Sequence, residues 1–589
     1  MVFLARLQVR KNQIFLISED DVLTENAHRN FFCDELDGKF DGKNTYVFES
    51  SDPDLLDAIK DYCIWLKVKL ISDAGAQEVE KELEKRTEDF EKLKKYAIKV
   101  KNQKQSTIKI PYLKKGIKLK SYQNSCVNHA NSLEASANFS VPGSGKTWMG
   151  YASYFLEKSK KNVNKLLVVG PNSSFKPWEH EYFEMTGEEP NVARITGKQK
   201  DRIAILNSSE FFEIFLVNYF IISKEFQRIK RMLSEDKFMI IVDESHHIKN
   251  PNSQAASALL ELANSAKKRM ILSGTPVPNN FDDLWSQFSF LYPNFQVFGG
   301  LLDYQFNLKN YEGFPAEQLA YVKEQIEPFY TRISKKDLQL PPINIKRIPI
   351  PMSETQERIY NAIRGHIKDN EKIRVDEVGV QKWKRAAMIY LLECATDPSL
   401  LSKSSQYDEK PIVAEGLPIQ EAIKEYPNLE VPNKLKVLSD LVKEIISRKD
   451  SQTKQNSKVI VWCSFVNSIK KIEEMLEEYN PICISGAVPK DEEDDPHDNR
   501  EIRIENFKTE SDCNLLIANP ASLAESISLH KSCHDAIYLD RTYNGGHYMQ
   551  SLERIHRIDI PPRTKTRYYI LQSKNSIDLN IDSRLEDKK

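Results

Sequence analysis

The stretch Ser140–Gly150 reads SVPGSGKTWMG, and it decides the fold that we expect. An apolar run precedes it and a helical pattern follows it, so its glycines lie where a strand should turn into a helix. Glycines let backbone N–H groups converge on an anion, a lysine ammonium neutralises phosphate charge, and a threonine hydroxyl can bind Mg²⁺. Ser140 stands where the strict pattern has glycine. The residues predicted to form this phosphate-binding turn are Gly143, Ser144, Gly145, Lys146 and Thr147.

A second apolar run ends in two carboxylates. FMIIVDESHH (238–247) predicts a strand followed by Asp243 and Glu244, and carboxylates at the carboxyl end of a parallel strand face the ligand crevice. Asp243 can then hold Mg²⁺ and Glu244 can polarise an attacking water. An acidic pair after a strand is also a common helix cap, so taken alone this pair leaves both interpretations open. His246 and His247 lack a third ligand, which disfavours a zinc site.

Outward from these motifs, apolar runs alternate with helix-length segments from about residue 110 to 300 and again after Asn433. This alternation is typical of parallel α/β sheets with crossover helices. Residues 301–430 change to helical patterning, and residues 1–50 have short apolar runs and turn-prone sequence before an amphipathic helix. The predicted domains are an N-terminal accessory domain (1–105), a first lobe (106–300), a helical insertion and linker (301–430) and a second lobe (431–589).

The composition excludes several classes of protein. The chain has 589 residues, 40% hydrophobic and 29% charged, so it can bury several cores and is not disordered. Its net charge of -1 leaves any polyanion binding to local clusters. Eight scattered cysteines without a C-x-x-C pair disfavour a disulfide framework, and no apolar run predicts a membrane span or a signal peptide. We therefore expect a protein of a reducing compartment, cytoplasmic or nucleoid-associated in a prokaryotic cell, and no membrane contact.

Two charge clusters stand out. Residues 91–120 contain eleven lysines against the single acid Glu91, and this segment is either a solvated linker face or a nucleic-acid contact. The run DEEDDPHDN (491–499) is interpreted as a solvated acidic loop, with a metal site disfavoured.

A series of motifs then supports a family resemblance. In chain order the sequence contains SYQ (121–123), PGSGKT (142–147), LLVVGPNSSFKPWEHE (166–181), DESHHIKN (243–250), SGTPVPNNFDDLWSQFSFLYP (273–293), RISKKDLQLPP (332–342), VIVWCSF (459–465) and QSLERIHRID (550–559). This series resembles the Swi/Snf-type ATPases of helicase superfamily 2, with a DEAH-like box, over roughly residues 115–575. The resemblance implies an α/β fold with two RecA-like parallel-sheet lobes and a helical insertion between them, to which the sequence adds a small α+β N-terminal accessory domain.

The same resemblance implies ATP and Mg²⁺ as cofactors, and it assigns roles in the first lobe. Tyr122 and Gln123 would contact adenine, and Lys146 would grip phosphate. Thr147 and Asp243 would hold Mg²⁺. Glu244 would then activate water, as the strand pattern already suggests.

In the second lobe, Arg554 and Arg557 look like the arginines that reach the γ-phosphate, with Arg557 as the arginine finger. Gln550 begins that motif and would position the nucleotide or couple it to the track. The residues that the family analogy places on DNA are Pro171, Asn172, Ser173, Thr275, Ser464, Phe465 and Asn519.

The chain departs from the family pattern twice. Leu523, Ala524 and Ser526 stand where glycines are common. The closing H-R-x-G-Q of the family keeps its arginine as Arg557 but has Asp559 and Ile560 in place of the glycine and the glutamine. We expect these changes to alter the approach to the DNA strand and the coupling to DNA rather than hydrolysis itself.

The leading interpretation is an ATP-dependent translocase on double-stranded DNA that moves along or remodels DNA or protein–DNA complexes. A compact chain without long tails is more similar to bacterial or viral members, several of which belong to anti-phage or restriction modules. Two alternatives stay open. The first is a strand-separating DNA or RNA helicase, and the second is an ATP-gated scaffold that recruits a partner nuclease through the N-terminal 105 residues.

Overall fold

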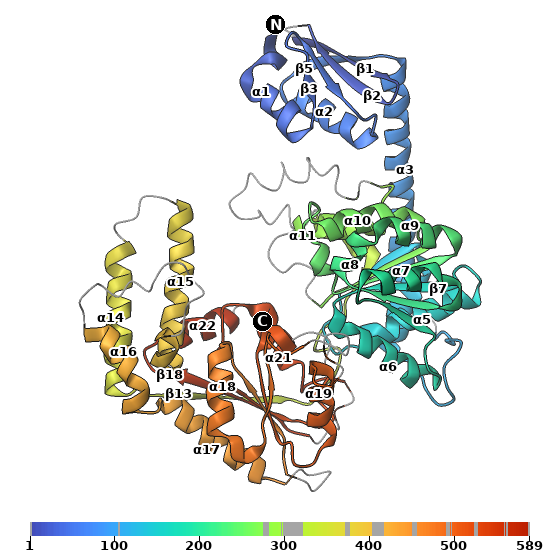
Figure 1. The fold of residues 1–589 in the computed structure, drawn as a ribbon. Coiled ribbons are helices and arrows are strands. Elements are labelled where there is room, and N and C mark those ends of the chain that lie inside the picture. The colour runs from blue at the N-terminus through green and yellow to red at the C-terminus, as the bar shows by residue number, and fades with distance from the viewer. Residues whose placement is uncertain are drawn as a thin grey trace. The chain divides into compact units, whose positions relative to one another are not determined.

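The computed structural model, shown in Figure 1, describes residues 3–19, 21–103, 107–274, 282–295, 297, 322–371, 377–402, 418–449, 456–489, 495, 497–523, 528–558, 560 and 564–586. The chain divides into two compact units. The first comprises Met1–Ser140, Lys146–Gly170 and Glu181–Arg332, and the second comprises Val141–Gly145, Pro171–His180 and Ile333–Lys589. Among the described residues, no helix has both the length and the apolar character needed to cross a bilayer.

The N-terminal part of the first unit is a small five-stranded sheet. Its strand order is β3-β4-β2-β1-β5, and only the β1–β5 pair is parallel. Leu56 and Ile59 of the helix α2 pack with Ala5 and Leu7 of β1 in one buried core. The elements are β1 (Phe3–Arg10), β2 (Gln13–Ser18), η1 (Asp21–Thr24), α1 (Asn26–Asn30), η2 (Phe31–Glu35), β3 (Lys39–Phe40), β4 (Thr45–Phe48), α2 (Pro53–Trp65) and β5 (Val68–Ser72).

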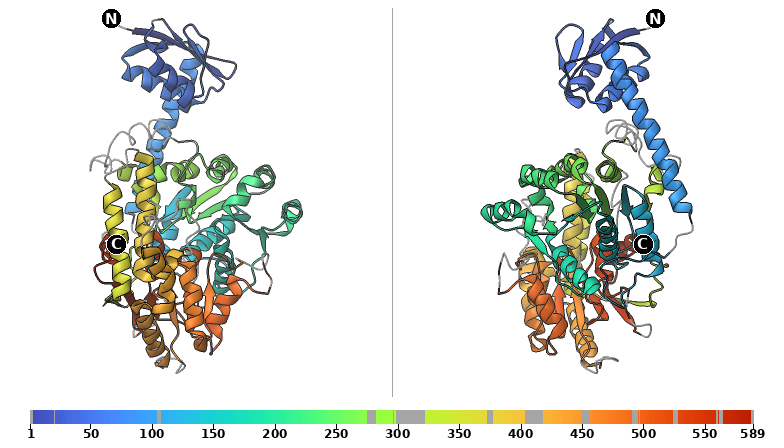
Figure 2. Two further views of the ribbon diagram at one scale, coloured as in Figure 1. Left: turned by 60° about the vertical axis from the view of Figure 1, so that its left-hand side comes forward. Right: turned by 90° about the vertical axis from the view of Figure 1, so that its right-hand side faces the viewer.

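A single long helix, α3 (Ala74–Asn102), continues from this small domain into the rest of the first unit (Figure 2). Its start is capped by the Asp73 carboxylate, which accepts the backbone N–H of Ala76 at 2.8 Å. Near its end, the Phe90 ring lies 5.7 Å from that of Phe329, and Ala97 is also buried. The amphipathic helix predicted from residue spacing is thus confirmed.

The rest of the first unit is a seven-stranded parallel sheet in the order β12-β6-β11-β10-β7-β9-β8. Every residue of β7 and β10 is buried, as expected for central strands covered by helices on both faces. The strands are β6 (Ala135–Asn138), β7 (Lys165–Val169), β8 (Val192–Ile195), β9 (Ile214–Val217), β10 (Phe238–Asp243), β11 (Lys268–Leu272) and β12 (Tyr330–Thr331). The helices are α4 (Ser121–Ser132), α5 (Lys146–Ser159), η3 (Asn172–Ser174), α6 (Phe175–Thr186), α7 (Gln199–Asn207), η4 (Ser209–Phe211), α8 (Tyr219–Lys224), α9 (Phe226–Glu235), η5 (Ser245–Ile248), α10 (Gln254–Leu262), η6 (Ala263–Ser265), α11 (Asp282–Leu291) and η7 (Glu327–Phe329).

The second unit holds a six-stranded parallel sheet in the order β13-β18-β17-β14-β16-β15. The strands are β13 (Ile343–Ile350), β14 (Val459–Trp462), β15 (Ile482–Ile484), β16 (Leu515–Ala518), β17 (Asp535–Tyr538) and β18 (Thr566–Ser573). The helices are α14 (Glu354–Glu371), α15 (Glu377–Thr396), η8 (Pro398–Ser402), α16 (Pro418–Leu429), α17 (Asn433–Ser447), α18 (Val466–Met475), η9 (Glu477–Tyr479), α19 (Arg500–Thr509), α20 (Pro520–Leu523), α21 (Gly545–Leu552) and α22 (Ile577–Glu586). Two parallel α/β sheets confirm the predicted fold class.

The segment 301–430 is more than the helical stretch that its sequence suggests. Residues 301–321 lie outside the described residues, and α14, α15 and α16 are helical as expected. However, Ile343–Ile350 forms β13, which pairs with β18 along its whole length. Because β13 is an edge strand with mostly exposed or half-buried side chains, it lacks the apolar run by which buried strands are recognised.

Candidate functional site

The predicted phosphate-binding turn connects β6 with α5. Gly143 and Gly145 have positive φ angles of 78° and 82°, a region that glycine adopts without the steric cost that a Cβ imposes. The side-chain oxygen Oδ1 of Asn138 accepts the backbone N–H of Ser140 at 3.1 Å, and the backbone N–H of Ser144 donates to the carbonyl oxygen of Val141 at 3.2 Å. These bonds hold the turn in a compact shape at the carboxyl edge of the sheet.

Lys146 begins α5, a helix of 14 residues. Its Nζ donates to the carbonyl oxygen of Ser140 at 3.1 Å, so the ammonium group folds back over the turn that precedes it. Thr147 follows in the first turn of the helix and is half-buried. The N-terminal N–H groups of a helix and a lysine ammonium together favour a bound anion at this place.

The acidic pair lies on the same edge of the same sheet. β11 lies between β6 and β10, and Asn138, Leu272 and Asp243 occupy one row of the strand register. The ends of β6 and β10 are therefore about 10 Å apart, which is two strand spacings. Asp243 is 8% exposed, and its carboxylate accepts the N–H of Glu244 at 3.0 Å. A side chain that reaches across the edge can thus approach a ligand bound at the turn.

Sequence reasoning missed Tyr219, which supports the acidic pair. Its hydroxyl donates to the carbonyl oxygen of Asp243 at 2.5 Å and lies 3.3 Å from that of Glu244. Glu244 has a φ of 54°, a left-handed conformation that is costly for a residue with a side chain. The Tyr219 ring also stacks on His247, with centroids 4.9 Å apart. Tyr219 therefore holds the backbone at the point where Glu244 adopts this left-handed conformation.

The two histidines after this pair stack on each other, and His246 also contacts the acidic pair. His246 stacks on His247 at 4.7 Å, and its Nδ1 lies 3.4 Å from both Glu244 Oε2 and Ser273 Oγ. Ser273 follows β11 and donates its N–H to Asn138 O at 3.1 Å. The end of β11 thus contacts the acidic pair on one side and the phosphate-binding turn on the other.

Tyr122 and Gln123 lie in the first turn of α4. The Gln123 side-chain oxygen accepts the backbone N–H of Lys120 at 2.9 Å, and only 3% of Gln123 is exposed. Tyr122 is half-buried. The glutamine predicted to contact adenine therefore also caps this helix.

In the second unit, Gln550, Arg554 and Arg557 occupy different environments. Arg554 is 2% exposed, and its Nε donates to the carbonyl oxygen of Gln550 at 2.9 Å. Arg557 is half-buried, and a Cβ atom built on Gly143 would lie 3.2 Å from its Cγ and 3.4 Å from its Nε. Of the two predicted arginines, Arg557 is thus the one recorded beside a glycine of the phosphate-binding turn.

Ser464, Phe465 and Asn519 lie at the carboxyl ends of the neighbouring strands β14 and β16. The Asn519 side-chain amide donates to the carbonyl oxygen of Ser464 at 2.7 Å. The N–H of Ser464 in turn donates to Asp540 at 2.6 Å, and burial raises the pKa of this carboxyl. Sequence reasoning missed Asp540, although it follows an apolar run as Asp243 does. Phe465 holds the N-cap position of α18 directly after Ser464, without a side-chain hydrogen bond to the helix.

The remaining predicted DNA contacts are only partly described. Pro171 precedes the short helix η3 and Ser173 lies within it, and the Ser174 hydroxyl donates to the carbonyl oxygen of Pro171 at 2.8 Å. Thr275 lies outside the described residues, as do Ala524, Ser526 and Asp559. Much of the acidic run 491–499 lies outside them too.

Several lysines of the 92–120 segment have partners within the first unit. Lys94 Nζ, on a residue 8% exposed, donates to the Gln325 side chain at 3.0 Å. Lys101 donates to the carbonyl oxygen of Glu327 at 2.6 Å. Lys95 and Lys99 are exposed on another face of α3. The segment is therefore divided, with some lysines stabilising the chain and others facing solvent.

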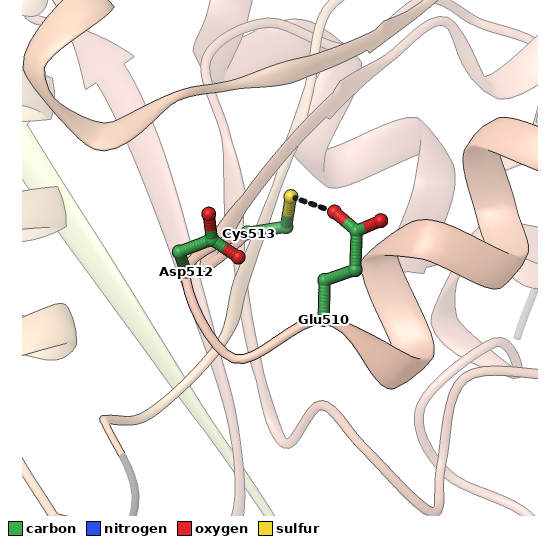
Figure 3. A group of neighbouring side chains, drawn as sticks. All are labelled: Glu510, Asp512 and Cys513. Carbon is green, nitrogen blue, oxygen red and sulfur yellow. Dashed lines mark hydrogen bonds between the residues drawn. The ribbon is translucent and has the colours of Figure 1, made fainter.

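A group of possible metal ligands lies away from these motifs. Figure 3 shows Glu510, Asp512 and Cys513, the Sγ of which donates to Glu510 Oε2 at 3.0 Å. Burial and the Glu510 carboxylate raise the pKa of this thiol to about 11, so it stays protonated at neutral pH. Lys458 Nζ also donates to the carbonyl oxygens of Glu510 and Cys513 at 2.6 and 3.1 Å. A thiol that keeps its proton beside an ammonium group does not suit a cation site.

Comparison with protein families covers most of the chain. Residues 82–398 match the SNF2-related domain, and residues 433–559 match the helicase conserved C-terminal domain. The first match includes the strands of the seven-stranded sheet, and the second match includes most strands of the six-stranded sheet.

Curated relatives are large proteins. ISWI chromatin-remodeling complex ATPase ISW1 of Saccharomyces cerevisiae is 23% identical over 463 residues, which are 76% of this chain and 37% of that protein. CHD3-type chromatin-remodeling factor CHR7 of Arabidopsis thaliana is 25% identical, over 74% of this chain and 34% of its own. The chain thus spans about a third of the length of these relatives. Lymphoid-specific helicase of Homo sapiens is 23% identical, with 76% of this chain and 58% of that protein covered.

Among solved structures, the Sulfolobus solfataricus SWI2/SNF2 ATPase core in complex with dsDNA is 22% identical. The similarity covers 81% of this chain and 92% of that one, with a TM-score of 0.38. The Sulfolobus solfataricus SWI2/SNF2 ATPase core domain gives 20% identity and a TM-score of 0.36.

Proposed function

The chain belongs to the SNF2-related family of helicase-type ATPases, and from this we propose that it is an ATP-driven translocase on double-stranded DNA. It would hydrolyse ATP to move along DNA or to remodel DNA or protein–DNA complexes. The observation that carries the proposal is the sheet edge of the first unit, on which the strand before the glycine turn and the strand before the acidic pair both end.

The residues of this edge fit ATP and Mg²⁺. Two glycines with positive φ leave backbone N–H groups able to converge on a phosphate, and Lys146 already lies over the turn. Thr147 and Asp243 offer oxygen ligands of the kind that Mg²⁺ prefers. Bound ATP and Mg²⁺ would supply the bond to be hydrolysed and the charge that neutralises its phosphates. Lys146 would then bind phosphate after leaving the Ser140 carbonyl.

Glu244 and Arg557 carry the proposed hydrolysis. Glu244 would orient the attacking water, and its backbone is held for this by Tyr219. Arg557 would stabilise the charge that develops on the γ-phosphate, and its position beside Gly143 within the second unit supports this role. Arg554, nearly fully buried, would position the helix that carries this motif.

The proposed track contacts are non-specific by their chemistry. Ser464 and Asn519 are bonded to each other, and Asp540 holds the Ser464 N–H. Small hydroxyl and amide groups at strand ends can contact backbone phosphates without reading bases. This arrangement suits a motor that moves along any sequence. Action within an antiviral or restriction module stays a prediction from the sequence.

The proposal is tested by measuring ATP turnover with duplex, single-stranded, forked and RNA cofactors. We expect duplex DNA to stimulate turnover, and Lys146→Ala to abolish it. A triplex-displacement assay then separates translocation from strand separation, because a translocase removes the third strand without opening the duplex. Stimulation by forked DNA together with duplex unwinding would favour the helicase alternative instead.

A further inference from the structure

One face of the five-stranded sheet of residues 3–72 lies opposite the core of this domain. Side chains alternate along its strands, and the odd residues of β1 and even residues of β2 and β4 enter the core that α2 also joins. The opposite residues stay outside this core and are half-buried or exposed. This open sheet face consists of Leu4, Arg6, Gln8, Arg10, Gln13, Phe15, Ile17, Lys39, Thr45, Val47, Lys69 and Ile71.

The register gives this face an aromatic centre and basic flanks. Phe15 of β2 lies between Val47 of β4 and Gln8 of β1. Lys39 continues that row at one edge of the sheet, and Lys69 lies on β5 at the other edge. A ring in the middle of a sheet with cations on both sides can stack a base while the flanks bind phosphates.

Charge is segregated between the layers of the domain. The five strands contain Arg6, Arg10, Lys39 and Lys69 and no acidic residue. The intervening helices are mainly acidic, and their acids include Asp21, Asp34, Asp57 and Asp61. The open sheet face is therefore positive within a domain whose opposite layer is negative.

Two of the four cations are partly neutralised. Arg6 Nε lies 2.5 Å from Glu19, and Lys39 Nζ lies 3.0 Å from Glu49, and both pairs are exposed enough to exchange partners. Among the described residues, no ion pair is recorded for Arg10 or Lys69. The face thus keeps positive charge for an anionic ligand.

We propose that the open sheet face of residues 3–72 binds single-stranded nucleic acid, with Phe15 stacking on a base and Arg10 and Lys69 contacting phosphates. Positive charge at both edges and an aromatic centre favour this ligand over a protein partner, for which the strand cations would have to be buried against matched acids. The site is separate from the strand-end residues proposed to contact duplex DNA, so its existence does not depend on the motor function.

The test uses the full chain without nucleotide and single-stranded oligonucleotides that carry 5-iodouracil, in a DNA arm and an RNA arm. Ultraviolet cross-linking followed by peptide mass spectrometry locates the contact. We expect the cross-link on the β2 peptide that contains Phe15. The arm with the higher yield identifies DNA or RNA as the source of the ligand.

Two variants and a matched control measure the contribution of the face. Lys69→Glu should lower oligonucleotide affinity about tenfold at low salt and reduce the salt slope by about 0.7, the value for one phosphate of a single strand. Lys43→Glu makes the same charge change in the exposed β3–β4 turn and should have little effect. Phe15→Leu keeps an apolar side chain but removes stacking and should also cost about tenfold.

Circular dichroism of each variant shows whether the domain stays folded, and duplex-stimulated ATP turnover is measured in parallel and should not change. Cross-links found only outside residues 3–72, or equal affinities of Lys69→Glu and Lys43→Glu, would overturn the proposal and leave the face to a protein partner. Loss of ATP stimulation by duplex in the wild-type chain would instead count against the motor.

Discussion

Tyr219→Phe removes one hydroxyl and tests whether the acidic pair depends on it. In the structure this hydroxyl donates to Asp243 O at 2.5 Å, and Glu244 beside it holds a left-handed backbone. A net hydrogen bond is worth about 0.5–1.5 kcal/mol, and the left-handed conformation costs about 1–2 kcal/mol that neighbouring contacts must offset. We therefore expect Glu244 to leave its position in part of the molecules.

If Tyr219 positions Glu244, the loss falls on the chemical step. A change of about 1.4 kcal/mol in the barrier corresponds to about tenfold in rate, so kcat for ATP should fall about tenfold. KM for ATP should stay within about twofold, because the phosphate-binding turn is untouched. The assay is steady-state ATP turnover at saturating duplex DNA.

Tyr154→Phe is the matched control. Its hydroxyl lies 3.1 Å from Asn164 O and 3.0 Å from Glu213 Oε1, next to the start of β7 and so at the other end of the sheet. Tyr154→Phe should lower thermal stability and leave kcat unchanged. An unchanged kcat in Tyr219→Phe, or an equal fall of kcat in both variants, would refute the positioning role.

Four further outcomes are expected. Glu244→Gln should abolish turnover but keep ATP binding, measured with a fluorescent nucleotide, whereas full activity would remove its role in water activation. Arg557→Ala should lower kcat by about 10³ or more without loss of fold, and a smaller change would assign the γ-phosphate to another residue. Lys434→Met should destabilise the second unit by about 3–5 kcal/mol in denaturant unfolding, because the buried Asp578 carboxylate, 2.7 Å from the ammonium, loses its partner. Unchanged stability would mean that the Asp578 carboxylate does not need this ion pair. Burial raises the pKa of Glu393 to about 7, so the folded state favours the protonated carboxyl, and the free energy of unfolding falls as pH rises from about 4.5 to about 7. Glu393→Gln should remove up to about 3 kcal/mol of that fall, measured by denaturant unfolding at pH 5 and pH 8. Parallel pH profiles of the variant and the wild-type chain would contradict this prediction.

Much of the first lobe could be predicted because its chemistry is local in sequence. Gly143, Gly145 and Lys146 lie within four residues, and Asp243 and Glu244 follow an apolar run, so short sequence patterns predicted both the phosphate-binding turn and the acidic pair. The rule that parallel strands present their carboxyl ends at one edge then placed them together. The two parallel sheets confirm the fold, and the strand register places the ends of β6 and β10 on one edge, while the roles of these residues in ATP binding and hydrolysis stay predictions.

Contacts between distant residues could not be predicted from such patterns. Tyr219 is 24 residues from Asp243, and only the order of strands β9 and β10 around β7 shows that they meet. The strand β13 could not be predicted, because an edge strand with few buried side chains shows no apolar run in the sequence. The open sheet face of residues 3–72 depends on which side of the sheet the helices cover, and alternation alone does not decide that.

The central claim, that ATP hydrolysis in this chain is coupled to duplex DNA, is tested most directly by the ATP turnover rate with and without a blunt duplex at low salt. The account predicts a rate that rises several-fold with duplex and falls to background in Lys146→Ala. A wild-type rate that is the same with and without duplex would contradict it.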